Sequence, residues 1–341
     1  IVLDLSAEED LAVARRLAAG GDVVVDNFKP GFLAARGLDH ATLAAADPSV
    51  VTCTITAFGE TGPAADLPGY DLVAQAMGGL MHLTGPADGP PHRVGVPIVD
   101  LTTGLYATIG VLAALAERAA TGRGRHVAVS LFDTALATLT NHATAALMAG
   151  ADPVRNGNRH ASIAPYEAYA AGDGDLIIAA ANDKLYARVC AALGRPDLLD
   201  DPRFVDNATR RAHIDELAAE LERTLAGAGR DEWVERLRAA DVPAGPILSI
   251  PEALAWATTM ELEPTVHHER YHGVRSPVRL DGRPAGADRV RRPPHLDEHG
   301  PEIKAQLTPD PASVSGKAPP QAPSRTQKRL GLVSLLVPDY D

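Results

Sequence analysis

Residues 2–27, which read VLDLSAEEDLAVARRLAAGGDVVVDN, decide the fold class of this chain. Residues 2–5 predict a short buried strand, and residues 22–27, an apolar run with β-branched side chains, predict a second one. Between them, residues 7–19 are rich in Ala, Leu and Glu and predict a helix. A strand, a helix and a strand in succession make a βαβ unit, so we expect a parallel sheet.

Polar and glycine residues mark the expected ends of this first helix. Ser6 is followed three residues later by Glu9, which is the pattern of a capping box at a helix start. Gly20 and Gly21 are expected to end the helix. In a parallel sheet, ligands bind at the carboxyl ends of the strands, so residues 27–31 form a candidate binding segment.

The same alternation of strands and helices continues to about residue 150. We expect further strands at residues 50–56 and 126–130, and helices at residues 70–83, 101–119 and 134–149. The first of these helices is expected to be interrupted at Gly78 and Gly79. Beyond this region, residues 152–159 are polar and rich in turn formers, which is typical of a linker. The expected domains are a large domain at 1–150, a linker and small α+β domain at 151–255, a return to the large domain at 256–307 and a disordered tail at 308–341.

Composition limits the classes of function. The chain has 341 residues, 45% of them apolar, which suits about two globular domains. Acidic residues outnumber basic residues by 44 to 32, which argues against nucleic acid and against an anionic membrane as partners. No apolar run is expected to reach the ~20 residues of a membrane span. Cys53 and Cys190 are too few for a disulfide framework or a multi-cysteine metal site, so we expect a cytoplasmic protein without a metal.

Two carboxylates at helix starts are candidate nucleophiles. Asp100 precedes the apolar residues 101–119, and Asp133 enters the next expected helix. A carboxylate at such a junction commonly caps the helix, and the same position also suits nucleophilic attack on an ester or thioester. The local pattern does not choose between the two residues. The sequence lacks a dinucleotide-binding glycine motif after its first expected strand, a phosphate-binding loop and a serine-nucleophile elbow.

Several short motifs occur in order along the chain. They are Asp26-Asn27-Phe28-Lys29-Pro30-Gly31, Ala57-Phe58-Gly59, Gly62-Pro63, Gly69-Tyr70-Asp71, Gly78-Gly79-Leu80-Met81, Thr121-Gly122-Arg123-Gly124 and Val242-Pro243-Ala244-Gly245-Pro246. With their spacing, they resemble the class III coenzyme A-transferases, the CaiB/BaiF family, over residues 1–305. The resemblance is greatest to the members that use succinyl-CoA and dicarboxylates, of the succinate–hydroxymethylglutarate type.

This resemblance implies an α/β fold with a Rossmann-like parallel-sheet large domain and a smaller α+β domain. It also implies that Asp100 is the catalytic residue and that Asp133 has no catalytic role. In the family, the aspartate attacks an acyl-CoA thioester to form a mixed anhydride, which the released thiolate converts to an aspartyl-CoA thioester. A carboxylic acid acceptor reverses these steps, so coenzyme A moves from a donor such as succinyl-CoA to the acid. Neither a tightly bound cofactor nor a metal is implied.

The resemblance also implies which residues contact the substrates. The expected contacts to coenzyme A are Leu3, Asp4, Leu5, Ser6, Asn27, Phe28, Lys29, Arg36, Pro68, Gly69, Tyr70 and Asp71. Ser6 stands where many members have a lysine, and Ala35 where many have a basic residue, so Arg36 would have to supply the cation for the phosphates. His160, Ala161 and Ser162 are the expected substrate loop.

Family members form intertwined dimers, so the resemblance implies a homodimer. Relatives also carry a further amino-terminal segment with the first strand of the sheet, which this chain is expected to lack. Two alternatives to transfer stay open. An acyl-CoA racemase or epimerase would need a second acid–base group, and Tyr70 stands where the racemases have a histidine. The other alternative is a truncated, inactive chain that binds coenzyme A.

Overall fold

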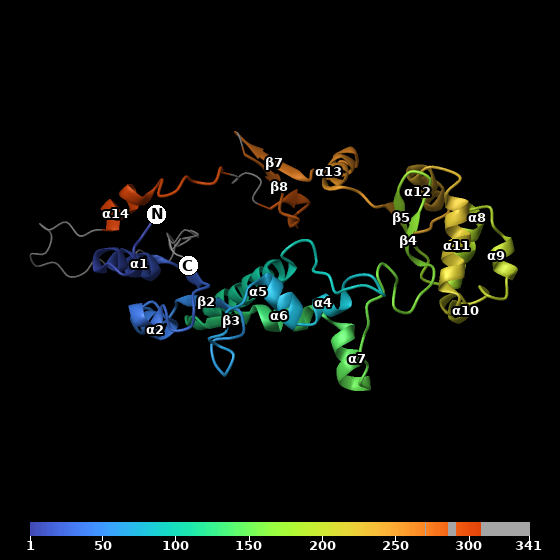
Figure 1. Ribbon diagram of the computed structural model, residues 1–341. Helices are drawn as coiled ribbons and strands as arrows, with labels where there is room; N and C mark the ends of the chain where they lie inside the picture. The colour runs from blue at the N-terminus through green and yellow to red at the C-terminus, as the bar shows by residue number, and fades with distance from the viewer. Residues whose placement is uncertain (270, 286–290, 308–341) are drawn as a thin grey trace, which may run out of the picture. The chain divides into compact units, whose positions relative to one another are not determined.

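The structure is a computed structural model that describes residues 1–269, 271–285 and 291–307 (Figure 1). These residues form two compact units. The first unit contains residues 1–85, 90–154 and 293–307, and the second unit contains the described residues of 86–89 and 155–292. Residues 256–292, expected in the large domain, are therefore part of the second unit. The tail expected at residues 308–341 lies outside the described residues.

The start of the chain does not form the strand expected at residues 2–5. Two carboxylates, one distant in the sequence and one nearby, bind its backbone instead. The amide of Val2 donates to Asp297 Oδ1 at 2.7 Å, and the amide of Asp4 donates to Asp10 Oδ2 at 2.8 Å. Because these amides find side-chain acceptors, the segment satisfies them without a neighbouring strand.

The first helix, α1 (Glu8–Gly20), begins without the expected capping box. Ser6 Oγ donates to Asp4 Oδ1 at 2.6 Å, and no side chain caps the helix, so the prediction from Ser6 and Glu9 is wrong. Short polar side chains often bond to nearby backbone or side chains in this way instead of capping. The carboxyl end is as predicted, because the helix stops at Gly20 and Gly21 follows in extended conformation.

A parallel sheet forms the centre of the first unit. Its strands are β1 (Val23–Asp26), β2 (Val51–Thr56) and β3 (His126–Ser130), in that spatial order. The predicted parallel sheet is confirmed. Successive side chains of a strand alternate between the two faces, so register partners share a face. One face therefore carries Val24, Asp26, Thr52, Thr54 and His126.

Helices connect these strands. They are η1 (Ala34–Arg36), α2 (His40–Ala46), α3 (Asp71–Met77), α4 (Leu80–Leu83), α5 (Ile98–Thr121), α6 (Leu131–Thr138) and α7 (Asn141–Ala149), and α14 (Gly300–Leu307) returns to pack on α1. Gly79 has a φ of 86° and separates α3 from α4. The single helix expected at residues 134–149 is instead divided into α6 and α7, where Thr140 has a φ of 45°.

Helix α5 is the longest helix among the described residues, and it begins at Ile98, so that Asp100 lies in its first turn. It packs on β2, β3 and α6. A side chain at Gly110 would place its Cβ 2.7 Å from a methyl of Val127, so glycine permits this close packing. The helix is long and apolar enough to cross a membrane, contrary to the sequence expectation, although core helices of soluble proteins meet the same criterion.

The second unit has its own antiparallel sheet, formed by β4 (Tyr166–Ala170), β5 (Asp175–Ala179) and β6 (Ala244–Pro246). The helices of this unit are α8 (Asp183–Ala192), α9 (Asp197–Asp200), α10 (Asn207–Ala212), α11 (Ile214–Leu225), α12 (Arg230–Ala239) and α13 (Ile250–Thr259). Two small hairpins complete it, β7 (Thr265–His268) with β8 (Tyr271–Val274) and β9 (Arg279–Leu280) with β10 (Arg283–Pro284). Helices α11 and α12 pack on the sheet and close its core.

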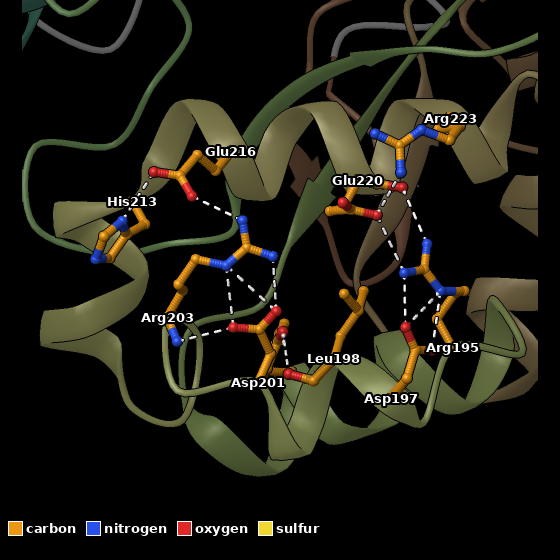
Figure 2. A network of polar contacts seen from close by, with 10 residues as sticks. Arg195, Asp197, Leu198, Asp201, Arg203, His213, Glu216, Glu220 and Arg223 are labelled. Carbon is orange, nitrogen blue, oxygen red and sulfur yellow. Dashed lines mark hydrogen bonds and ion pairs between the residues drawn. The ribbon is translucent and has the colours of Figure 1, made fainter.

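Arginine–carboxylate pairs link the helices of the second unit (Figure 2). Arg203 Nη2 donates to Asp201 at 2.7 Å, and its Nη1 donates to Glu216 of α11 at 2.7 Å. Arg195 in the same way joins Asp197 to Glu220. Arg203 donates hydrogen bonds that lower the pKa of Asp201 to about 2, so this carboxylate stays ionised over a wide pH range.

Candidate active site

The two candidate nucleophiles differ in what their carboxylates contact. Asp133 accepts a hydrogen bond from Ser130 Oγ at 2.7 Å, and this serine in turn caps α6 by accepting from the amide of Asp133. The carboxylate of Asp100 is exposed and accepts no hydrogen bond from any residue that the structure describes. Asp133 therefore belongs to a helix cap, whereas the oxygens of Asp100 are open to an incoming group.

Asp71 holds the helix turn that carries Asp100. The Oδ1 atom of Asp71 accepts from the amides of Val99 at 2.8 Å and Asp100 at 3.3 Å. Its Oδ2 atom accepts from Gln75 Nε2 at 2.6 Å, and Gln75 Oε1 accepts from the amide of Val94 at 2.9 Å. Both side chains are buried. A buried carboxylate from α3 thus satisfies the first amides of α5, which would otherwise have no partner.

This arrangement also changes the acidity of Asp100. Partial desolvation by neighbouring atoms raises the pKa of this otherwise exposed carboxyl, and the negative charge of Asp71 raises that pKa further. Both effects disfavour the ionised form of the Asp100 carboxyl, so this carboxylate is more basic than an ordinary aspartate. A more basic carboxylate is a stronger nucleophile when it is ionised.

The structure places the expected contacts at residues 3–6 at the start of the first unit. Leu3 and Leu5 are 3% and 6% exposed and pack in the core with α1, so only their backbone could meet a ligand. Asp4 and Ser6 are exposed and bonded to each other. Hydrogen bonds donated by Ser6 lower the pKa of Asp4.

The segment after β1 borders a cavity of about 230 Å³ in the first unit, and Phe28 and Lys29 line it. Asn27 and Lys29 are exposed, and Phe28 stacks on Phe32 with ring centres 4.5 Å apart. An ammonium group beside an exposed amide and an aromatic ring could meet a phosphate and a flat base.

Arg36 joins this segment to residues 3–6. Its guanidinium lies 3.6 Å from the centre of the Phe32 ring. Its Nε donates to the carbonyl of Leu5 at 3.2 Å, and its Nη1 donates to the carbonyl of Phe32 at 3.0 Å. The Nη2 atom of Arg36 has no acceptor among the described residues. Arg36 therefore lies beside the expected contacts at residues 3–6, and its Nη2 atom is available to a ligand.

The last expected contacts, at residues 68–71, lead directly into α3. Tyr70 is 66% exposed at the start of this helix. A Cβ at Gly69 would lie 2.7 Å from the Cβ of Ala57, so glycine lets the two chain segments touch. Asp71 differs from the other expected contacts, because its buried carboxylate is directed to the amides of α5.

The expected substrate loop belongs to the second unit, whereas Asp100 belongs to the first. His160, Ala161 and Ser162 are all exposed. The amide of Ser162 donates to His160 Nδ1 at 3.1 Å, and Asn207 Nδ2 donates to the carbonyl of Ser162 at 2.9 Å. The loop thus presents an imidazole and a hydroxyl on a segment that Asn207 anchors.

The sequence did not predict that Asp71 would hold the first turn of α5 or that Gln75 would bond to Asp71. It also missed a group of polar side chains around Thr52 on the sheet face described above. The sequence spacing of these residues gives no periodic signal, since they come from different elements. Within the described ranges, no group of three or more histidine, cysteine or acidic side chains has an arrangement that could hold a metal ion.

Residues 1–300 match the family model of CoA-transferase family III. The chain belongs to this family. The resemblance inferred from the motifs is therefore confirmed, and the chain is an enzyme of the CoA-transferase class.

Relatives of this CoA-transferase include enzymes with named substrates. The succinate–glutarate CoA-transferase of Agrobacterium fabrum is 37% identical over 314 residues, which cover 90% of this chain and 78% of the relative. The acetyl-CoA:oxalate CoA-transferase of Acetobacter aceti is 36% identical over 310 residues, covering 90% and 79%. A crystal structure of a CaiB/BaiF family protein from Brucella suis has 39% identity and a TM-score of 0.82, covering 90% of this chain and 81% of the other.

Proposed function

We propose that this CoA-transferase moves coenzyme A from an acyl-CoA donor, succinyl-CoA or a similar ester, to a carboxylic acid. The observation that carries the proposal is the exposed carboxylate of Asp100 on a helix turn whose amides are fixed by the buried Asp71. A nucleophile of this kind needs free oxygens and a fixed backbone. The other candidate, Asp133, has its carboxylate bonded within a helix cap.

In the proposed reaction, an oxygen of Asp100 attacks the thioester carbon of the donor. The C–S bond breaks, the thiolate of coenzyme A leaves, and an acyl–aspartyl anhydride forms. The thiolate then attacks the aspartyl carbonyl, releases the donor acid as a carboxylate, and leaves coenzyme A on Asp100 as a thioester. The acceptor carboxylate attacks this thioester to give a second anhydride, and the thiolate takes the acceptor acyl group and frees Asp100. Each step conserves charge and requires no external oxidant or reductant.

Backbone amides near Asp100 and in the glycine-containing residues 57–63 are proposed to stabilise the oxyanion of each addition step. Lys29 and the free nitrogen of Arg36 are proposed to bind phosphates of coenzyme A. We propose that the expected contacts at residues 3–6, 27–29 and 68–71 line the path of coenzyme A. The acyl-CoA is a substrate in this scheme, so the proposal contains no tightly bound cofactor.

The names of the relatives support a dicarboxylate acceptor. Succinate, glutarate and oxalate appear in those names, and all three are dicarboxylates. A second carboxylate on the acceptor would need its own partner, and His160 and Ser162 of the expected substrate loop offer donors for it.

We also propose a homodimer and a cytoplasmic location. One stripe of α5 leaves large apolar side chains exposed, namely Leu101, Leu105, Ile109 and Leu112. An apolar stripe of this kind is typical of an interface, and the proposed occupant is a second copy of the chain. Sedimentation velocity should give twice the mass of one chain, and a single-chain mass would contradict the dimer. The two buried free thiols, Cys53 and Cys190, fit a reducing compartment.

The proposal is tested by transfer from succinyl-, acetyl-, formyl- and aromatic acyl-CoA donors to a panel of mono- and dicarboxylic acids, followed by mass spectrometry. Asp100→Ala should lower the rate by about 10⁴-fold or more, because it removes the nucleophile. Asp133→Ala is the matched control, since it removes an exposed aspartate at the next helix start. Equal activity in the two variants would refute the proposed role of Asp100.

A further inference from the structure

A hydrogen-bonded chain of four side chains runs along one face of the sheet of the first unit. Thr52 of β2 is buried, and its Oγ1 lies 3.0 Å from His40 Nδ1 and 2.8 Å from His126 Nδ1. His126 Nε2 lies 2.7 Å from Glu60 Oε2. Thr52 and His126 belong to β2 and β3, and His40 is the first residue of α2. Glu60 comes from the glycine-containing loop after β2.

The carboxylate of Glu60 sets the direction of the bond from His126, and the other two directions follow when His126 is neutral. An ionised carboxylate only accepts, so His126 Nε2 carries a proton and donates to Glu60. In a neutral His126 the Nδ1 atom is then an acceptor, and Thr52 donates its one proton to it. The oxygen of Thr52 consequently accepts from His40, which carries its proton on Nδ1.

The chain of bonds can hold one positive charge but not two. If both imidazoles were protonated, both Nδ1 atoms would donate to Thr52 Oγ1, its own proton would lose its acceptor, and like charges would face each other. Burial lowers the pKa of His40, and His126 lowers it further. The other ionisable side chains that line the adjoining cavity are Asp26, Lys29 and Asp39. The neutral arrangement of His40 is therefore favoured near pH 7.

Glu60 lies near the start of residues 57–71, which connect β2 to α3 and end at Asp71. Both ends of this segment are packed: the carbonyl of Ala57 accepts from the amide of Phe132 at 3.0 Å, and Gly69 packs on Ala57. Between them, the described backbone hydrogen bonds of residues 60–68 are local, from Ala65 to Gly62 and from Leu67 to Ala64. Near the start of the segment, the amide of Gly59 donates to Thr56 Oγ1 of β2 at 2.9 Å. The contact between His126 and Glu60 adds a side-chain tie from the segment to the neighbouring strand β3.

We propose that Glu60 is a positioning residue, which the His126–Thr52–His40 chain holds in place so that residues 57–71 keep Asp71 against the helix turn of Asp100. This inference rests on the proposed function of Asp100. Glu60 has no described contact with Asp100, and it acts through the segment that ends at Asp71. All four residues also line the cavity beside Lys29.

The test compares Glu60→Ala with Glu60→Gln, because the glutamine carbonyl can still accept from His126. Glu117→Ala is the matched control, since Glu117 pairs with Arg125, the neighbour of His126 in sequence. Glu60→Ala should lower kcat/KM for CoA transfer by about tenfold, because small misplacements of reacting groups are costly. It should also move the acidic limb of the pH profile to lower pH, since Asp71 would no longer lie beside Asp100. Glu60→Gln and Glu117→Ala should keep the rate and the profile of the parent chain.

Hydrogen exchange of the full chain gives a second readout that does not depend on activity. In Glu60→Ala, the amides of residues 57–71 should exchange faster, while those of β5 in the second unit should not change. Unchanged exchange in residues 57–71 would overturn the inference, even if the parent chain transfers no coenzyme A and the proposed function fails. The amides of residues 57–71 could also exchange faster while the acidic limb of CoA transfer stays at the same pH in an active enzyme. That result would overturn the inference too, because Glu60 would then stabilise the segment without positioning Asp71.

Discussion

The two units of this chain bury their apolar side chains to different degrees. In the second unit, large side chains such as Phe204, Leu221 and Leu237 are completely buried in one core. In the first unit, Leu105 and Ile109 of α5 are 64% and 62% exposed, although the same helix packs on the sheet. The second unit thus closes a core with its own residues, whereas the first unit leaves an apolar face open beside its candidate site.

The two units also differ in whether their carboxylates have a charged partner. Asp201 in the second unit is bonded to Arg203, which lowers its pKa to about 2 (Figure 2). Asp100 in the first unit has no such partner among the described residues, and burial and Asp71 raise its pKa. Paired carboxylates stabilise a fold, whereas a perturbed, unpaired carboxylate is typical of a reactive site. We therefore propose that the chemistry takes place in the first unit, at the unpaired carboxylate.

The largest stability difference is expected between Leu221→Ala and Leu105→Ala. Leu221→Ala should lower the free energy of unfolding of the second unit by about 3 kcal/mol at any protein concentration, because it leaves a cavity in a closed core. Leu105→Ala should act only through the proposed dimer, so its cost should fall below about 0.5 kcal/mol as the protein is diluted. Urea unfolding followed by circular dichroism, with the fluorescence of Trp233 for the second unit, measures both. If Leu105→Ala lowers the free energy of unfolding by the same amount at every protein concentration, Leu105 does not act through a dimer.

A smaller effect is expected when the charge next to Asp100 is removed. In Asp71→Asn, the new amide group would face the amide of Gln75, so one buried hydrogen bond is lost at a cost of about 1 kcal/mol. Loss of the like charge should also lower the pKa of Asp100, so the acidic limb of CoA transfer should move to lower pH. Asp66→Asn, an exposed aspartate in the preceding segment, is the control and should change neither quantity. A limb that moves to higher pH in Asp71→Asn would show that Asp71 does not act on Asp100 as described.

The smallest effect concerns the acid stability of the second unit. The folded-state pKa of Asp201 is about 2, below its ordinary value of 3.8, so its contribution is present above about pH 4 and is lost as the pH falls toward 2. In Asp201→Asn this part of the pH dependence should disappear, and stability should vary less between pH 4 and 2. Fluorescence of Trp233 during acid and urea titrations follows this change, with Asp200→Asn as the neighbouring control. An equally steep loss in Asp201→Asn would mean that other groups govern acid unfolding.

The sequence predicted those parts of the fold that depend on neighbouring residues. The strands β1, β2 and β3 coincide with the runs that predicted them, and α1 ends where Gly20 and Gly21 predict its end. The break between α3 and α4 was likewise signalled by Gly78 and Gly79, since Gly79 adopts a positive φ that other residues avoid. These features are local, so a pattern of adjacent side chains is sufficient to predict them.

Features that depend on distant residues could not be predicted. The start of the chain is held by Asp297, 295 residues away, and forms no strand. The turn of Asp100 is held by Asp71, 29 residues away, and no spacing rule relates a carboxylate on one helix to the amides of another. Local pattern therefore left Asp100 and Asp133 equivalent, and the family resemblance chose between them. The hydrogen bond from Ser130 to Asp133, visible only in the structure, supplies a physical reason for that choice.

The central claim is that Asp100 becomes covalently attached to the acyl group and then to coenzyme A. The most direct measurement is to incubate the enzyme with succinyl-CoA and hydroxylamine, digest it, and identify the modified peptide by mass spectrometry. We expect a hydroxamate on Asp100 that appears only when acyl-CoA is present and is absent from Asp100→Ala. An active enzyme that acquires no modification at Asp100 under these conditions, or one that is modified at Asp133 instead, would refute the role of Asp100 as the nucleophile.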